Sequence, residues 1–245
     1  MSSQNTSKVA LVTGATRGIG FETVRQLASS GVHVLLAGRD RSKAVEASLR
    51  LQSEGLPVEA ITLDVTRADS IANAAQEIAQ KHGKLDILVN NAGVFRDDAE
   101  RKPSEQSLDT WRETFDTNVF GVVATTQAFL PLLKLAPSAR IVNLSRILVS
   151  VAANADPASP IYDFKVPAYN VSKSAVNAWT VQLAHELRDT NIKVNAVHPG
   201  SVKTDMNSHG ELEVADGAKT SVRMALLDDA GPNGGFVYFE DTLPW

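Results

Sequence analysis

The sequence predicts an α/β fold: one domain in which helices flank a doubly wound, seven-stranded parallel sheet. Short β-branched, apolar runs alternate with longer amphipathic segments along the whole chain, and such alternation implies right-handed strand-helix-strand crossovers. No linker rich in Pro, Gly or Ser divides the 245 residues. We therefore expect residues 1–245 to form a single domain.

The seven expected strands are mostly continuous apolar runs, which is typical of strands covered on both faces. They are residues 8–14, 33–38, 58–64, 85–91, 140–145, 192–197 and 235–239. The clearest helical pattern between them covers residues 66–82. Thr66 and Asp69 resemble a capping box at its start, and Gly83 supplies its end.

Composition excludes several classes of protein. Hydrophobic residues make up 43% and charged residues 21%, a balance typical of globular proteins. The net charge is −4 and no basic run stands out, which argues against nucleic-acid binding. The chain has no cysteine, a polar start and no apolar span of membrane length. A soluble cytoplasmic protein without a membrane partner is the expectation.

Two irregular segments, residues 149–166 and 203–217, follow directly after predicted strand ends. In open α/β sheets, ligands bind outside the carboxyl ends of the strands. These two segments are therefore the candidates for the walls of a substrate site.

A glycine-rich loop, TGATRGIG, joins the first expected strand to a helical pattern. Glycines in this position permit a tight turn and bring backbone N–H groups close to a pyrophosphate at the helix start. A plain strand-to-helix turn is the simpler alternative, but the strand-loop-helix context favours a Rossmann-type dinucleotide site. Its candidate residues are Gly14, Thr16, Arg17, Gly18, Ile19 and Gly20.

The end of the second strand bears on the choice of cofactor. Arg39, with Arg17 in the loop, suits the 2′-phosphate of NADP, whereas a carboxylate such as Asp40 would accept from the 2′-hydroxyl of NAD. Both arginines could instead be solvated surface charges. NADPH/NADP is the favoured cofactor, and NAD remains the minority alternative.

Tyr169 and Lys173 stand four residues apart at the start of a helical pattern, with Pro167 suited to its first turn. This spacing places both side chains on one helix face, where a cation lowers the pKa of a phenol toward the range useful for acid-base catalysis. Taken alone, the pair could be ordinary helix surface.

Five motifs occur together and in order: TGATRGIG, NNAG, TNVFG, YNVSK and PGSVKTDM. With them the chain resembles the short-chain dehydrogenase/reductase family over nearly its whole length. Its GRD after the second strand and its ending GPNGGFVYFEDTLPW look most like the carbonyl reductase branch that uses NADPH.

The resemblance implies hydride transfer between nicotinamide and a small-molecule carbonyl or alcohol substrate. Tyr169 would be the general acid in reduction, Lys173 would hold the nicotinamide ribose, and Asn118 would anchor a water in the proton relay. Asp64 and Val65 would flank the adenine. The other implied cofactor contacts are Asn90, Ala92, Gly93, Pro199, Gly200, Val202 and Thr204.

The chain departs from its family at Arg146, where relatives commonly carry the serine that binds the substrate carbonyl. Because strand side chains alternate between faces, Ser145 replaces that serine only through a register slip or a local twist. Arg146 could polarise the carbonyl itself, although its charge also favours phenolate at Tyr169. It could turn outward while Ser145 or Ser150 moves in. The third possibility is a catalytically impaired NADPH-binding protein, natural or engineered. Val149 favours this possibility, because relatives often carry a smaller residue near that position.

Other chemistries have less support. The five histidines show no metal-ligand spacing, so no metal site is expected. GxSxG is absent, which argues against a hydrolase. An epimerase or dehydratase would carry a differently spaced glycine loop. The resemblance leaves the oligomeric state open, because the family includes dimers, tetramers and monomers with an insertion, for which residues 154–165 are a candidate.

Overall fold

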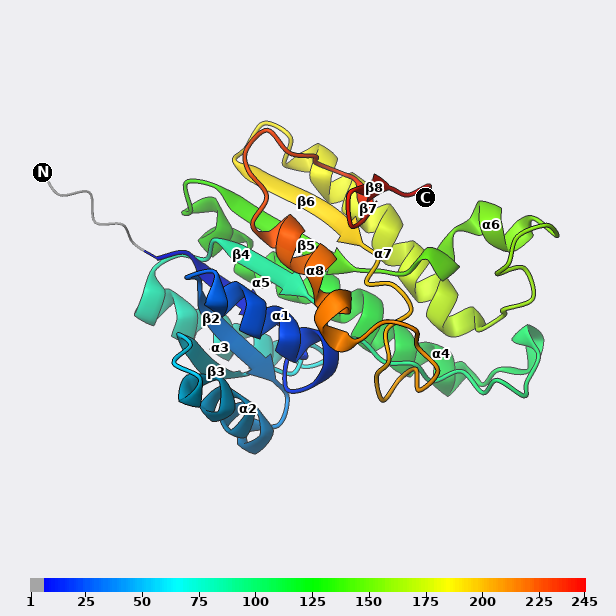
Figure 1. The fold of residues 1–245 in the computed structure, drawn as a ribbon, viewed down its shortest axis with the longest axis horizontal. Helices are drawn as coiled ribbons and strands as arrows, with labels where there is room; N and C mark the ends of the chain where they lie inside the picture. Colours follow the sequence, from blue (N-terminus) through cyan, green and yellow to red (C-terminus); the bar gives the residue numbers. More distant parts are fainter. Residues whose placement is uncertain (1–6) are drawn as a thin grey trace, which may run out of the picture.

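A single eight-stranded sheet organises the protein (Figure 1). The computed structural model describes residues 7–245, so residues 1–6 of the predicted domain and its polar start lie outside the described part. The sheet order is β3-β2-β1-β4-β5-β6-β7-β8. The strands are β1 (Val9–Val12), β2 (His33–Gly38), β3 (Val58–Thr62), β4 (Ile87–Asn90), β5 (Ala139–Leu144), β6 (Ile192–Val197), β7 (Phe236–Tyr238) and β8 (Asp241–Thr242).

The seven predicted strands are confirmed, and they run parallel. The prediction missed β8, a two-residue strand that pairs antiparallel with β7. Both of its residues are exposed polar side chains, so β8 carries none of the apolar pattern by which buried strands are recognised.

Helices cover both faces of the sheet. They are α1 (Gly18–Ser29), α2 (Arg41–Ser53), α3 (Ala68–His82), α4 (Leu108–Phe115), α5 (Gly121–Lys134), α6 (Val151–Ala155), α7 (Pro167–Glu186) and α8 (Val214–Ala225). One apolar core joins α1, α2 and α8 to the sheet, and a second core joins α3, α5 and α7 to its other face. Alternate residues of one strand enter different cores, as Leu11 and Val12 do. This explains why the strands are apolar throughout.

Within residues 7–245, no helix has both the length and the apolar character needed to cross a bilayer.

The start of α3 differs from the prediction, whereas its end agrees. The Thr66 hydroxyl donates to Asp64 Oδ1 at 2.7 Å, two residues away, and the helix begins only at Ala68 without a side-chain cap. The capping box of Thr66 and Asp69 is therefore wrong, because a nearer carboxylate engages the threonine. Gly83 ends the helix with φ 71°, the left-handed conformation that glycine adopts readily.

A buried polar ladder fixes α7 on the sheet. Asn90 Nδ2 of β4 donates to Asn143 Oδ1 of β5 at 2.9 Å, and Asn143 Nδ2 donates to Thr180 Oγ1 of α7 at 2.9 Å. Asn90 also donates to Thr126 of α5 at 2.9 Å. Asn143 and Thr180 are fully buried. Because buried amides that lose their partners are costly, the ladder stabilises α7 in this position.

We expect Asn143→Leu to lower the free energy of unfolding by about 2–3 kcal/mol, because two buried hydrogen bonds are lost. The exposed helical Asn73→Leu is the matched control, with an expected change within about 0.5 kcal/mol. Urea denaturation of both variants measures the difference. Equal small effects would show that the ladder does not stabilise the fold.

Candidate active site

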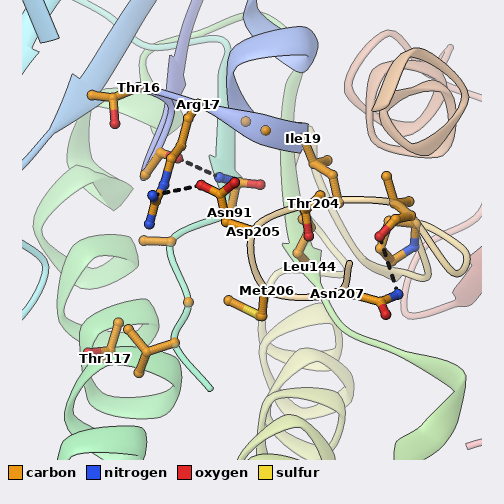
Figure 2. Close-up of a pocket in the computed structure, with 18 of the residues that line it drawn as sticks. Thr16, Arg17, Ile19, Asn91, Thr117, Leu144, Thr204, Asp205, Met206 and Asn207 are labelled. Atoms are coloured by element: carbon orange, nitrogen blue, oxygen red, sulfur yellow. Dashed lines mark hydrogen bonds and ion pairs between the residues drawn. The ribbon is translucent and has the colours of Figure 1, made fainter. Parts of the chain in front are cut away.

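The main cavity lies at the carboxyl ends of the strands and has a volume of about 510 Å³ (Figure 2). It collects most of the residues expected from the sequence. Those lining it are Gly14, Thr16, Arg17, Gly18, Ile19, Gly20, Arg39, Asp64, Val65, Ala92, Gly93, Arg146, Tyr169, Lys173, Pro199, Gly200, Val202 and Thr204. Asn90 and Asn118 are not among the lining residues.

Neighbouring side chains lock the glycine loop. Asn91 Nδ2 donates to the carbonyls of Thr13 and Gly14 at 2.8 and 3.0 Å. A Cβ on Gly20 would lie 2.4 Å from that same nitrogen, so only glycine fits there. The first turn of α1 holds no acidic residue and has no side-chain cap. Gly18, Ile19 and Gly20 of this turn line the cavity, as an anion site at a helix start requires.

The charged residues near the end of β2 have separate roles. Asp40 Oδ1 accepts from the backbone N–H of Ser42 and Lys43 at 2.9 and 3.2 Å and so caps α2. Hydrogen bonding from the Ser42 side chain is the main cause that lowers the pKa of Asp40. Arg39 borders the cavity, and Asp40 does not. The acidic group on which the NAD alternative depends is therefore committed to a helix cap.

Arg17 reaches across the cavity to the loop after β6. Its Nη1 lies 2.8 Å from Asp205 Oδ2, and Figure 2 shows this pair joining the glycine loop to the opposite wall. Both side chains are more than 70% exposed, at 79% and 75%. An exposed pair of this kind is worth about 0–1 kcal/mol, so a phosphate can compete for Arg17.

Tyr169 and Lys173 lie on successive turns at the start of α7, where Pro167 is the first residue. Asp97 Oδ1 and Oδ2 accept from the backbone N–H groups of Ala168 and Tyr169 at 2.8 and 2.9 Å. Lys173 Nζ donates to the Leu144 carbonyl at the end of β5 at 2.7 Å. Helix α7 is thus held at its first turn by a distant carboxylate that sequence reasoning missed.

Burial dominates the titration of this pair. It raises the pKa of Tyr169, against the opposing charge and hydrogen bonding of Arg146. Burial, together with the Arg146 charge, also lowers the pKa of Lys173 to about 8. The phenol is therefore protonated at neutral pH, and the concern that Arg146 depletes the acid form is not supported.

Asn118 lies behind the cavity on a π-helical turn, Asp116–Phe120, between α4 and α5. Its amide accepts from the Val94 N–H at 2.8 Å and donates to the Val94 carbonyl and Ser172 Oγ at 2.9 and 3.0 Å. Single π turns often occur at functional sites. Here the turn connects the Gly93–Val94 wall to α7. Asn90 belongs to the buried ladder and does not reach the cavity.

Ser145 and Arg146 follow β5 and both border the cavity, so strand alternation does not separate them. Ser145 is 1% exposed, and its hydroxyl has no hydrogen-bond partner among residues 7–245. Arg146 is half-buried, and its guanidinium forms no ion pair with any described residue. Ser150 caps α6 and donates to the Trp245 carbonyl at 3.2 Å. Of the two serines considered as replacements, only Ser145 is at the site.

One of the two segments predicted to be substrate walls lines the cavity. Residues 203–217 contribute Lys203, Asp205, Met206, Asn207 and Val214 in addition to Thr204. No residue of 149–166 lines the cavity, because that segment turns into α6 and runs outward (Figure 1). The prediction for 149–166 is therefore wrong. The other unpredicted lining residues are Gly38, Leu63, Thr66, Asn91, Val94, Thr117 and Leu144.

Several of these lining residues could have been predicted from the sequence. Gly38, Leu63, Thr66, Asn91 and Val94 all stand within one to three residues of a predicted contact. Thr117 precedes Asn118 in the quoted TNVFG motif. Flanking positions of strand-end motifs would have been the signal.

Comparisons with known proteins identify the family of the chain. A protein-family model described as short chain dehydrogenase matches residues 8–213. The chain is 35% identical to Short-chain dehydrogenase/reductase 1 of Saponaria officinalis, with 97% of this chain and 96% of the relative covered. Salutaridine reductase from Papaver somniferum has a similar structure, with a TM-score of 0.80, 32% identity and coverage of 94% and 99%. NADPH-bound carbonyl reductase from chicken fatty liver has a TM-score of 0.84, 28% identity and coverage of 98% and 99%.

His198 provides a test of burial at this site. Burial, with the Arg146 charge, lowers its pKa from 6.5 to about 4, and its Nδ1 accepts from the Gly200 N–H at 3.3 Å. Between pH 6.5 and about pH 4, His198 therefore binds a proton in the unfolded chain but stays neutral in the folded chain. We expect the free energy of unfolding to fall by roughly 2–3 kcal/mol as pH drops through this window.

His198→Asn keeps an acceptor but cannot titrate, so it should remove this part of the pH dependence. Urea denaturation at neutral and acid pH measures the slope, and the exposed His185→Asn is the control. An unchanged slope in His198→Asn would contradict the assignment.

Proposed function

Because the chain belongs to the short-chain dehydrogenase/reductase family of oxidoreductases, we propose that it is an NADPH-dependent carbonyl reductase. Its substrate is a small ketone or aldehyde, or the alcohol in the reverse direction. The observation that carries the proposal is the pair Tyr169 and Lys173, which borders the cavity from successive turns of α7.

The cavity residues fit a phosphorylated dinucleotide. The cradle of Gly14 and Gly20 leaves no room for a Cβ, since one on Gly14 would lie 2.8 Å from Ala92 Cα. The uncapped start of α1 would hold the pyrophosphate, and Arg39 and Arg17 at the cavity would hold the 2′-phosphate. NADPH supplies the hydride when it is bound. The NADPH-bound chicken carbonyl reductase supports this choice of cofactor.

Proton transfer in reduction falls to Tyr169. Its buried phenol is protonated at neutral pH and donates to the substrate oxygen as that oxygen gains negative charge. The Lys173 ammonium, fixed to the Leu144 carbonyl, stabilises the phenolate that remains. Asn118 acts as a positioning residue through Val94 and Ser172.

Arg146 takes the role that the missing serine has in relatives. Its Nε has no hydrogen-bond partner among residues 7–245, and the charge and hydrogen bonding of its guanidinium act on Tyr169. It can therefore donate to the substrate oxygen and stabilise a developing alkoxide. The second candidate function is NADPH binding with little turnover. The observation that favours it is the bulk and charge of Arg146 in the place of a small hydroxyl.

Reductase assays on a panel of ketones and aldehydes, read from the absorbance of the reduced nicotinamide, test this proposal. Tyr169→Phe removes the acid and should lower kcat by about 10²–10⁴-fold. The exposed Tyr162→Phe is the matched control and should retain full activity. Equal activity of wild type and Tyr169→Phe would exclude Tyr169 as the acid.

Arg146→Ser distinguishes the two candidate functions. If Arg146 binds the substrate oxygen, its replacement should lower kcat. The decrease should be at most about 10²–10³-fold, the effect of losing one oxyanion donor. If Arg146 blocks the chemistry, the starting protein binds NADPH without turnover and Arg146→Ser gains activity. The second result would overturn the reductase assignment.

Cofactor preference follows from the two arginines at the cavity edge. Arg39→Ala and Arg17→Ala should each weaken NADPH binding about tenfold, the value of one charge-assisted phosphate contact, and leave NADH binding nearly unchanged. Titration by nicotinamide fluorescence measures both affinities, with Arg188→Ala, remote from the cavity, as the control. A wild type that binds NADH as tightly as NADPH would contradict the assignment.

A further inference from the structure

Three side chains from separate elements converge at the end of the sheet opposite the cavity. His33 is the first residue of β2, Glu59 lies near the start of β3, and His82 is the last residue of α3. Figure 1 shows these three elements grouped at one side of the protein. One ligand atom from each residue lies within 4.8 Å of the other two. None of the three lines the active-site cavity.

The distances suit metal coordination better than hydrogen bonding. Glu59 Oε2 lies 3.6 Å from His33 Nε2 and 3.5 Å from His82 Nε2. These separations exceed the N–H···O range of about 2.7–3.2 Å. A tetrahedral zinc ion with bonds of about 2.0–2.2 Å holds its ligand atoms about 3.3–3.6 Å apart. The oxygen-to-nitrogen edges of such a site are therefore already present.

The two imidazole nitrogens are otherwise unused. His33 Nε2 and His82 Nε2 are buried and have no hydrogen-bond partner among the described residues. The two rings lie 5.1 Å apart, tilted by 41°. Buried polar atoms without partners are rare in native proteins and call for an explanation such as an ion.

The charges around the cluster leave one carboxylate oxygen available. Lys81 hydrogen-bonds Glu59 Oε1 and pairs also with Glu77 at 3.0 Å, so Oε2 alone faces the histidines. One carboxylate oxygen therefore faces two imidazole nitrogens, and these three atoms lie within 4.8 Å of one another.

We propose that His33, Glu59 and His82 form a zinc site, with water as the fourth ligand. Two imidazoles and one carboxylate are a known donor set for Zn²⁺. The ion would cross-link β2, β3 and the end of α3, and so stabilise this edge of the sheet. Because the site lies at the opposite end of the strands, it takes no part in hydride transfer and is independent of the proposed function.

Calorimetric titration of the metal-stripped full-length protein with Zn²⁺ tests the site. We expect one ion per chain and a rise in the melting temperature. His33→Gln and His82→Gln should each weaken binding by more than tenfold, since loss of even an outer-shell partner commonly costs about 10–100-fold. His185→Gln, an exposed histidine outside the cluster, is the matched control and should bind as the wild type does.

His82→Cys separates a lost ligand from a damaged fold, because a thiolate also binds zinc. Zinc binding that persists in His82→Cys and is lost in His82→Gln supports the site. Absence of stoichiometric binding to the wild type would overturn it, as would equal affinity in His33→Gln, His82→Gln and the His185→Gln control. A third result would also overturn the proposed site. If Zn²⁺ inhibits reduction and the His33 and His82 variants bind it as tightly as the wild type does, the ion binds at the cavity instead.

Discussion

The position of α7 on the sheet depends on buried polar groups that must all be satisfied. The Asn90–Asn143–Thr180 ladder ties the middle of α7 to two central strands. The Lys173–Leu144 bond and the Asp97 carboxylate tie its first turns. Because an unpaired amide or ammonium in this interior is costly, sliding or rotation of α7 would break several of these contacts together. The geometry of Tyr169 against the cavity follows from that constraint.

Burial and charge act in opposite directions at the catalytic tyrosine candidate. Low polarity around Tyr169 favours its neutral form, while Arg146 favours the phenolate, and burial prevails. Both effects act in the same direction on Lys173 and His198, whose pKa values fall to about 8 and about 4. The charge of Arg146, just after β5, thus acts on the pKa values of Tyr169, Lys173 and His198.

The two ends of the sheet have different chemistry for a topological reason. Parallel strands place all their carboxyl ends at one edge, where the loops after β1, β2, β3, β4, β5 and β6 meet and form the cavity. At the other edge the strand starts meet the ends of preceding helices, which brings His82 of α3 beside His33 and Glu59. Ligand-binding groups can lie at either edge. Only at the first edge do they belong to short sequence motifs that follow the strands.

The sequence by itself determined the seven parallel strands, the glycine loop, Pro167 at the start of α7 and the end of α3 at Gly83, because each depends on residues adjacent in the chain. Only the tertiary structure decided that Asp97 caps α7, that Asp205 pairs with Arg17, and that Asp40 serves α2. Only the tertiary structure also decided that residues 149–166 lie outside the cavity lining and that His33, Glu59 and His82 lie close together. The physical reason is that local patterns specify backbone conformation, whereas the partner of a polar side chain is set by distant segments that packing brings within hydrogen-bond reach.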